Sequence, residues 1–286
     1  MPAAVLGLLS AIVYGSADFF GGVAARRIGP VRTTAVGAIS GLLLLLLALP
    51  LAGGVWSAAA LGWGVLSGLV GSIAVGLLYA CLALGPMSIL SPLTALVSAL
   101  VPMAWGLLGG DRFGVLGYIA LGMALVAVVL VGFVPEKGAV RPSLRALLMA
   151  VGAGAMIGVF LILLDQTPSD SGVVPLIANR AVNGAVMWSV VALLVLRSRR
   201  RAATGPRLDA RRSGIAVAAG ALDASANLLI LLGLRLGDLT TMSVLVALYP
   251  AGTILLAAVV LRERVAPVQW AGLVLAVVAA ALLSVA

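Results

Sequence analysis

Three ionisable residues lie inside long apolar stretches of the sequence, namely Asp18, Arg180 and Asp223. A charged side chain within a membrane helix is costly, and it usually faces a cavity or an opposite charge. With a helical rise of about 1.5 Å per residue, Arg180 lies about 12 Å and Asp223 about 16 Å below one membrane surface, and Asp18 lies about 22 Å below it. Arg180 and Asp223 can therefore form an ion pair if their helices face each other.

Two interpretations of Arg180 and Asp223 remain open. As a structural feature, the pair ties the helix bundle together. As a functional feature, Arg180 binds a substrate carboxylate, and Asp223 binds an amine or a proton. The polar neighbours favour function, because Asn179 and Asn183 flank Arg180 and Asn227 lies one helical turn from Asp223. We expect these five residues to line a substrate site.

Three aromatic residues lie deeper in the apolar stretches than most of the others, which fall near the ends of their stretches. They are Tyr14, Trp188 and Tyr249. Aromatic residues at the ends of membrane helices usually anchor at the interface, whereas deeper ones can line a pocket. We therefore add these three residues to the candidate substrate site.

Asp18 has two interpretations of its own. It lies one turn from Tyr14 on the same helix face, which suits the wall of a cavity with a protonatable group. Alternatively, its side chain extends toward Arg26 or Arg27 near the end of the stretch. In the first interpretation Asp18 is a candidate for proton coupling, as is Asp223.

The composition indicates an all-α membrane protein. Of 286 residues, 63% are hydrophobic and only 9% are charged, and the apolar stretches exceed the roughly 10 residues of a barrel strand. The chain has no histidine and a single cysteine, Cys81. Because a metal centre or an active site needs ligands, a base or a nucleophile, we expect no metal, no cofactor and no enzyme activity. We expect a monomer or a homodimer.

The apolar stretches predict ten membrane spans, separated by glycine, proline and charged residues. We expect them at residues 3–25, 32–51, 58–82, 89–108, 113–132, 144–164, 172–196, 213–234, 239–261 and 267–285. The polar segment around residues 135–143 is the predicted linker between two five-helix halves, at residues 1–134 and 144–286.

The basic residues predict the orientation of the spans. Of 18 Lys and Arg residues, only Arg112 and Arg235 fall in loops on the side of the two termini, and Arg180 lies inside a span. Basic loops stay in the cytoplasm, so we expect both termini to face outward from a cell membrane, the inner membrane of a bacterium. The Arg-rich loop at 197–212 then anchors the topology, and we expect no nucleic-acid partner.

The second half of the sequence repeats the first at a constant offset. Gly85 aligns with Gly237, Ser91 with Ser243, and the pair Asp111-Arg112 with Glu263-Arg264. A repeated unit with an odd number of spans must be inverted in the membrane relative to its copy. Inverted repeats are typical of secondary transporters.

The chain resembles the EamA-type proteins of the drug/metabolite transporter superfamily over nearly its whole length. The residues that carry this resemblance are Leu234-Arg235-Leu236-Gly237-Asp238, Ser243, Tyr249-Pro250-Ala251-Gly252-Thr253, Leu261-Arg262-Glu263-Arg264, Gln269 and Gly272. The first repeat departs from the pattern, with Asp111 where the family usually has glutamate.

The resemblance implies a transporter that works by alternating access around a central cavity. We expect it to export small metabolites such as amino acids, with proton coupling and facilitated diffusion both open. A multidrug or organic cation exporter is the alternative, and it predicts a cavity-facing acid without a nearby arginine. A membrane protein that does not transport is the third interpretation.

Overall fold

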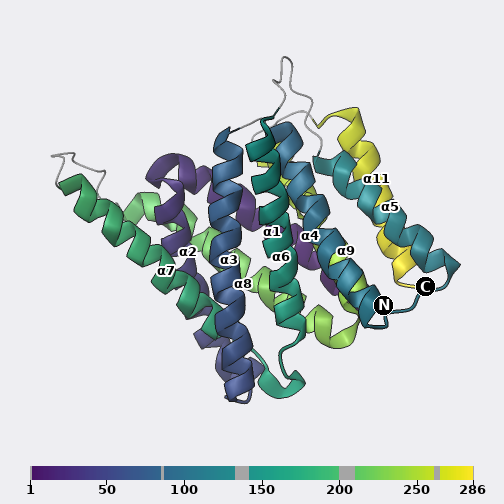
Figure 1. The fold of residues 1–286 in the computed structure, drawn as a ribbon, viewed down its shortest axis with the longest axis horizontal. Helices are drawn as coiled ribbons and strands as arrows, with labels where there is room; N and C mark the ends of the chain where they lie inside the picture. The colour runs from purple at the N-terminus through teal and green to yellow at the C-terminus, as the bar shows by residue number, and fades with distance from the viewer. Residues whose placement is uncertain (1, 85–86, 133–141, 200–209, 261–264, 286) are drawn as a thin grey trace.

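The computed structural model describes residues 2–84, 87–132, 142–199, 210–260 and 265–285, and within them the chain is helical without strands (Figure 1). The helices are α1 (Pro2–Ile28), α2 (Pro30–Ala52), α3 (Ala58–Leu84), α4 (Met87–Gly109), α5 (Val115–Gly132), α6 (Leu144–Asp165), α7 (Val174–Arg199), α8 (Ala210–Leu236), α9 (Leu239–Val246), α10 (Tyr249–Val260) and α11 (Pro267–Leu283), with a 3-10 turn at Ser169–Ser171.

The predicted class of an all-α membrane protein with ten spans is confirmed. Among the described residues, nine helical stretches are long and apolar enough to cross a membrane, and α11 is a shorter apolar helix. Large apolar side chains such as Leu47 and Val259 are exposed on the outside of the bundle. Such a surface suits hydrocarbon, where every backbone polar group must be satisfied within the helix itself.

The predicted span at 239–261 consists of two helices, because α9 ends at Val246 and α10 begins at Tyr249. At the break, the amide of Leu248 donates to Leu245 O at 3.1 Å, which tightens the last turn of α9. Pro250 has no amide hydrogen to continue the helical pattern. The corresponding span of the first half, α4, stays continuous although it contains Pro92 and Pro102.

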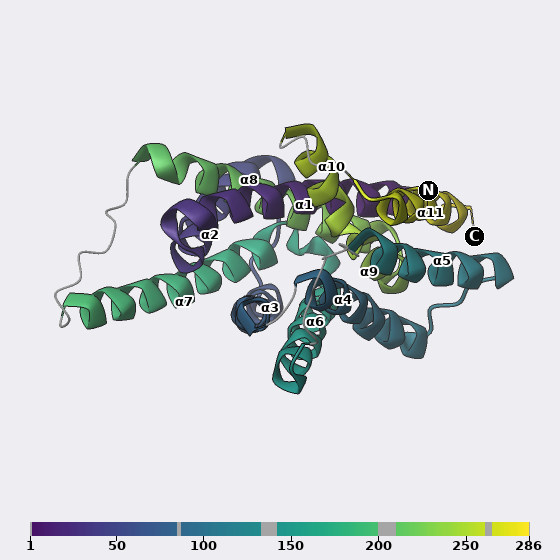
Figure 2. The same cartoon turned by 90° about the horizontal axis from the view of Figure 1, so that it is seen from above.

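Helix packing follows the inverted repeat. In the repeat, α1, α2 and α3 of the first half correspond to α6, α7 and α8 of the second. The contact of α1 with α8 accordingly has its counterpart in the contact of α6 with α3, and the contact of α2 with α8 has its counterpart in that of α7 with α3. The helices α2 and α7, α4 and α9, and α5 and α11 contact their own counterparts. Figure 2 shows α1 beside α8, and α6 between α3 and α4.

The helix bundle has two ends, the terminal side and the linker side. The terminal side is the end where α1 begins and α11 ends, and both termini lie there (Figure 1). The linker side is the opposite end, where α1 ends at Ile28 and α6 begins at Leu144. The Oγ of Ser143 caps α6 by accepting a hydrogen bond from the amide of Ala146 at 3.2 Å.

Two glycine contacts set the closest helix approaches. A Cβ at Gly15 of α1 would overlap with the carbonyl oxygen of Tyr249 in α10. A Cβ at Gly220 of α8 would overlap with the backbone of Gly37 in α2. Small residues let membrane helices approach closely, so these glycines fix α10 against α1 and α8 against α2.

Several sequence predictions fall on residues outside the described part of the chain. They include most of the predicted linker, most of the Arg-rich loop, and the Glu263-Arg264 counterpart of Asp111-Arg112. The division into domains therefore stays a prediction.

Candidate functional site

An ion pair between α7 and α8 forms the centre of the candidate site. The Arg180 guanidinium donates to the Asp223 carboxylate, and their side chains are 12% and 26% exposed. The two residues thus form the ion pair that their similar depths allowed, while their role toward a substrate stays a prediction. The side chain of Arg180 passes α2 beside Gly41, where an added Cβ would lie 3.5 Å from Arg180 Cδ and 3.0 Å from Gly220 O. A larger residue at position 41 would crowd this passage.

Asn227 completes the polar cluster around Asp223. It lies one turn further along α8 and is only 2% exposed. Its Nδ2 donates to the backbone oxygen of Asp223 at 2.7 Å and to Oδ1 of that residue at 3.5 Å. Among the described residues, Asn227 Oδ1 and Arg180 Nε are buried and have no hydrogen-bond partner. The cluster therefore holds one donor and one acceptor that a rearrangement or a ligand would have to satisfy.

Asn179 and Asn183 lie at the interface of α7 with α3. Asn179 Nδ2 donates to Ser67 Oγ at 2.9 Å, and Asn183 Nδ2 donates to Ser72 Oγ at 3.3 Å. Both asparagines are buried. Their side-chain amides therefore tie α7 to α3, beside the ion pair, and their role as substrate ligands stays a prediction.

Tyr14 and Tyr249 face each other across the contact of α1 with α10. Their ring centroids lie 5.7 Å apart with an interplanar angle of 60°, and both side chains are partly buried. Tyr14 lies within electrostatic range of Asp18, Arg180 and Asp223. The structure thus brings five of the predicted site residues together, from α1, α7, α8 and α10.

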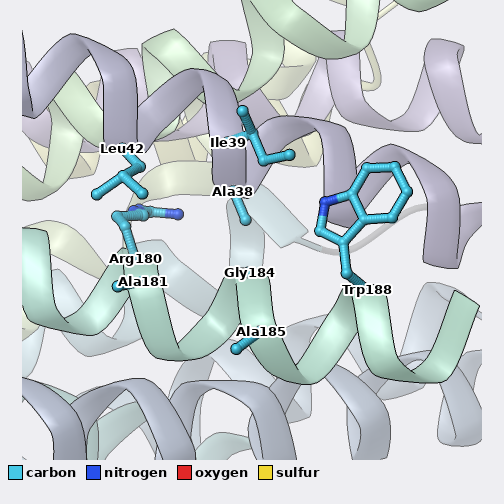
Figure 3. A pocket seen from close by; sticks show the side chains of 8 residues that line it. All are labelled: Ala38, Ile39, Leu42, Arg180, Ala181, Gly184, Ala185 and Trp188. Atoms are coloured by element: carbon cyan, nitrogen blue, oxygen red, sulfur yellow. The ribbon is translucent and has the colours of Figure 1, made fainter. Parts of the chain in front are cut away.

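Trp188 lines a separate groove between α2 and α7, two turns from Arg180 (Figure 3). Its indole Nε1 donates to the backbone oxygen of Ala35 at 3.2 Å. The cavity in this groove has a volume of about 230 Å³. Its lining residues are Ala38, Ile39, Leu42, Arg180, Ala181, Gly184, Ala185 and Trp188. Arg180 is the residue that the groove shares with the ion pair.

Loops and helix ends of the two halves are hydrogen-bonded to one another on the terminal side. Asp111 Oδ2 accepts from Thr240 Oγ1 at 2.6 Å and from the Thr240 amide at 3.2 Å. The Val55 amide donates to Asp170 O at 2.9 Å, and the Val173 amide donates to Gly53 O at 3.2 Å. We call these three connections the terminal-side clasp.

Arg235 adds a connection within the second half on the same side. Its guanidinium donates to Thr167 O at 2.6 Å and to Pro168 O at 2.8 Å. This fixes the end of α8 to the loop that carries Asp170. Arg235 therefore stabilises the loop whose Asp170 backbone oxygen takes part in the clasp.

Sequence reasoning did not identify the roles of Asp111, Ser67 and Ser72 in joining helices. Asp111 was notable only as the repeat counterpart of Glu263, yet it bonds to α9 across the two halves. Ser67 and Ser72 carried no signal, because serine is common in membrane helices and its partner depends on helix rotation. The Gly-Gly-Asp-Arg turn at 109–112 could have indicated a functional loop.

Comparisons with known proteins agree with this architecture. Residues 144–285 match the model of the EamA-like transporter family. A solved crystal structure shares the fold with a TM-score of 0.75 and 17% sequence identity, over 99% of this chain and 98% of the other. No curated protein matches the chain. The second half of the chain is thus similar to the EamA-like transporter family, and the fold is shared with the solved structure over the whole length, in agreement with the resemblance seen in the sequence.

Proposed function

We propose that the protein is a secondary transporter that exports small metabolites such as amino acids across the inner membrane. The observation that carries this proposal is the Arg180–Asp223 ion pair inside the bundle, with Asn227, Tyr14 and Tyr249 around it. Arginine provides donors for a carboxylate, and aspartate provides acceptors for an amine. A zwitterion such as an amino acid could engage both groups.

The two ends of the bundle support a mechanism of alternating access. On the terminal side, the clasp joins the two halves through Asp111, Thr240 and the paired loops. Toward the linker side, Asp18 and Gly22 on α1 are exposed. In the proposed cycle the substrate reaches the site from the linker side, and the clasp then opens to release it at the terminal side. The distribution of basic residues in the sequence supports a linker side that faces the cytoplasm.

The alternative of an organic cation exporter has one observation in its favour and one against. Asp223 is paired with Arg180, which favours a zwitterion over a simple cation. Asp18, in contrast, forms no ion pair with a described residue. Proton coupling through Asp18 or Asp223 would fit either substrate class.

The proposal is tested with purified protein in proteoliposomes. We expect saturable uptake and counterflow of at least one labelled amino acid, measured with and without a pH gradient. Arg180→Ala should abolish this transport while circular dichroism shows an intact helical fold. If no amino acid moves but organic cations do, the alternative replaces the proposal, and movement of neither class would contradict a transport function.

A further inference from the structure

Asp18 is an acid without a partner, although it lies on the inner face of α1. Successive residues of a helix are rotated by about 100°, so Asp18 lies nearly opposite the exposed apolar residues Val5, Leu9 and Ile12. Its side chain is nevertheless exposed, and it forms no hydrogen bond or ion pair within the described part of the chain. Asp18 is therefore accessible, on a face of α1 that points away from these apolar residues.

Two tyrosine rings, those of Tyr14 and Tyr249, lie near Asp18. Tyr14 lies one turn from Asp18 on the same helix face, at a spacing that brings side chains within about 6 Å at Cβ. The Tyr249 ring lies 5.7 Å from that of Tyr14, and the Tyr249 backbone packs on Gly15 of α1. Tyr249 also lies within electrostatic range of Asp18. A carboxylate beside two aromatic rings is the arrangement that favours an organic cation.

The charges of the described residues around Asp18 leave one negative charge uncompensated. Asp18 and Asp223 lie within electrostatic range of each other, and Tyr14 lies within range of both and of Arg180. Arg180 is bound to Asp223, so it compensates that carboxylate. An isolated charge inside a membrane protein is costly. A cation bound beside Asp18 would remove this cost.

We propose that Asp18, together with the rings of Tyr14 and Tyr249, binds the ammonium group of the transported substrate. The inference rests on the proposed transport function and narrows it to compounds that carry an ammonium group. In this arrangement Asp18, and not Asp223, binds the amine, while Asp223 stays paired with Arg180 and Arg180 keeps its proposed role toward the substrate carboxylate. A proton competes with the amine for the same carboxylate.

A binding experiment on purified protein tests this site without relying on transport. The probe is tritiated phenylethylamine, measured by scintillation proximity, with its N-acetyl derivative as an uncharged competitor. We expect the amine to bind and the N-acetyl compound not to compete. Asp18→Asn should weaken binding by at least about tenfold, since the charge is lost while the shape is kept. Asp165→Asn, at the terminal-side end of α6, is the matched control and should bind normally.

The tyrosines supply a second, graded readout. Tyr14→Phe keeps the ring and should retain most of the affinity, whereas Tyr14→Leu should weaken binding by about fivefold.

The inference is overturned if phenylethylamine does not bind, if Asp18→Asn binds it as well as the wild type, or if the N-acetyl compound competes equally. If amino acids are transported at unchanged rates by Asp18→Asn, the ammonium site is wrong and the transport function stands. If nothing is transported while the amine still binds through Asp18, the transport function is wrong and the ammonium site stands.

Discussion

At the residue scale, the Arg180–Asp223 pair shows how a membrane interior holds opposite charges. The pair is only partly exposed, and the guanidinium reaches the carboxylate past Gly41 of α2. Removing one member of a buried pair leaves an uncompensated charge, which is far more destabilising than removing both. Comparing the stability of single and double variants therefore distinguishes a role of the pair in substrate binding from a role in holding the fold.

We therefore expect the single and double variants of the pair to differ in stability. Arg180→Gln should lower the free energy of unfolding by on the order of 2 kcal/mol, because it leaves Asp223 without its counter-charge. Adding Asp223→Asn to this variant should recover most of the loss. Thermal unfolding in detergent, followed by circular dichroism, measures both. A double variant that is less stable than either single one would contradict this account of the pair.

The sequence could predict which residues of this site are present, but not how each of them faces. The depth of Arg180 and Asp223 follows from their positions in the helices, and it correctly predicted that they could pair. The partners of Asn179 and Asn183 depend on how α7 is rotated against α3, which no single helix determines. The contact of Tyr14 with Tyr249 likewise requires the crossing of α1 and α10, which are far apart in the chain.

At the element scale, close helix contacts position the site. α8 carries Asp223 and Asn227, and it lies against α2 where Gly220 meets Gly37. The spans themselves were predictable from apolar length, because about 20 residues are needed to cross the hydrocarbon. The complete break between α9 and α10 was not, since prolines in α4 leave that helix continuous. A proline shows where a helix can bend, and the neighbouring helices decide whether it breaks.

We expect Gly220→Ala to destabilise the protein and Gly71→Ala to leave it unchanged. The new methyl group at position 220 would overlap with the backbone of Gly37, and such overpacking typically costs about 1–3 kcal/mol. At Gly71 of α3, an added Cβ meets no atom within 4 Å. Melting temperatures of the two variants in the same detergent compare them directly. Equal melting temperatures would show that α2 and α8 can separate without cost.

At the scale of the whole molecule, the described residues are joined on the terminal side, while Asp18 and Gly22 are exposed toward the linker side. The two halves share a scaffold that is exchanged by the inverted repeat, yet the internal charges differ between them. Asp18 belongs to the first half, and Arg180 and Asp223 belong to the second. A symmetric frame with asymmetric chemistry can open alternately to both sides while the same residues hold the substrate.

The clasp should control from which side the cavity is reached. We expect Gly22→Cys, in a Cys81→Ser background, to react with a membrane-impermeant maleimide from the linker side and only slowly from the terminal side. Adding Asp111→Asn should raise labelling from the terminal side by about tenfold, because a hydrogen bond to a charged group is weakened. Rates in vesicles of both orientations provide the measurement.

The control for this experiment is Asp165→Asn at the same end of the bundle. Within the described part of the chain, the Asp165 carboxylate accepts its one side-chain hydrogen bond from its neighbour Gln166, at 3.3 Å, so its replacement should leave labelling unchanged. Equal labelling from both sides before the clasp is altered would contradict a closed terminal side.

The central claim is that transport depends on the charges of Arg180 and Asp223 and not only on the helices that carry them. The most direct test is the initial rate of amino acid counterflow in proteoliposomes for the wild type and for the folded Arg180→Gln/Asp223→Asn double variant. We predict that the double variant loses at least about tenfold in rate, equivalent to a rise of about 1.4 kcal/mol in the activation free energy of transport. A double variant that is folded and transports at the wild-type rate would contradict the claim.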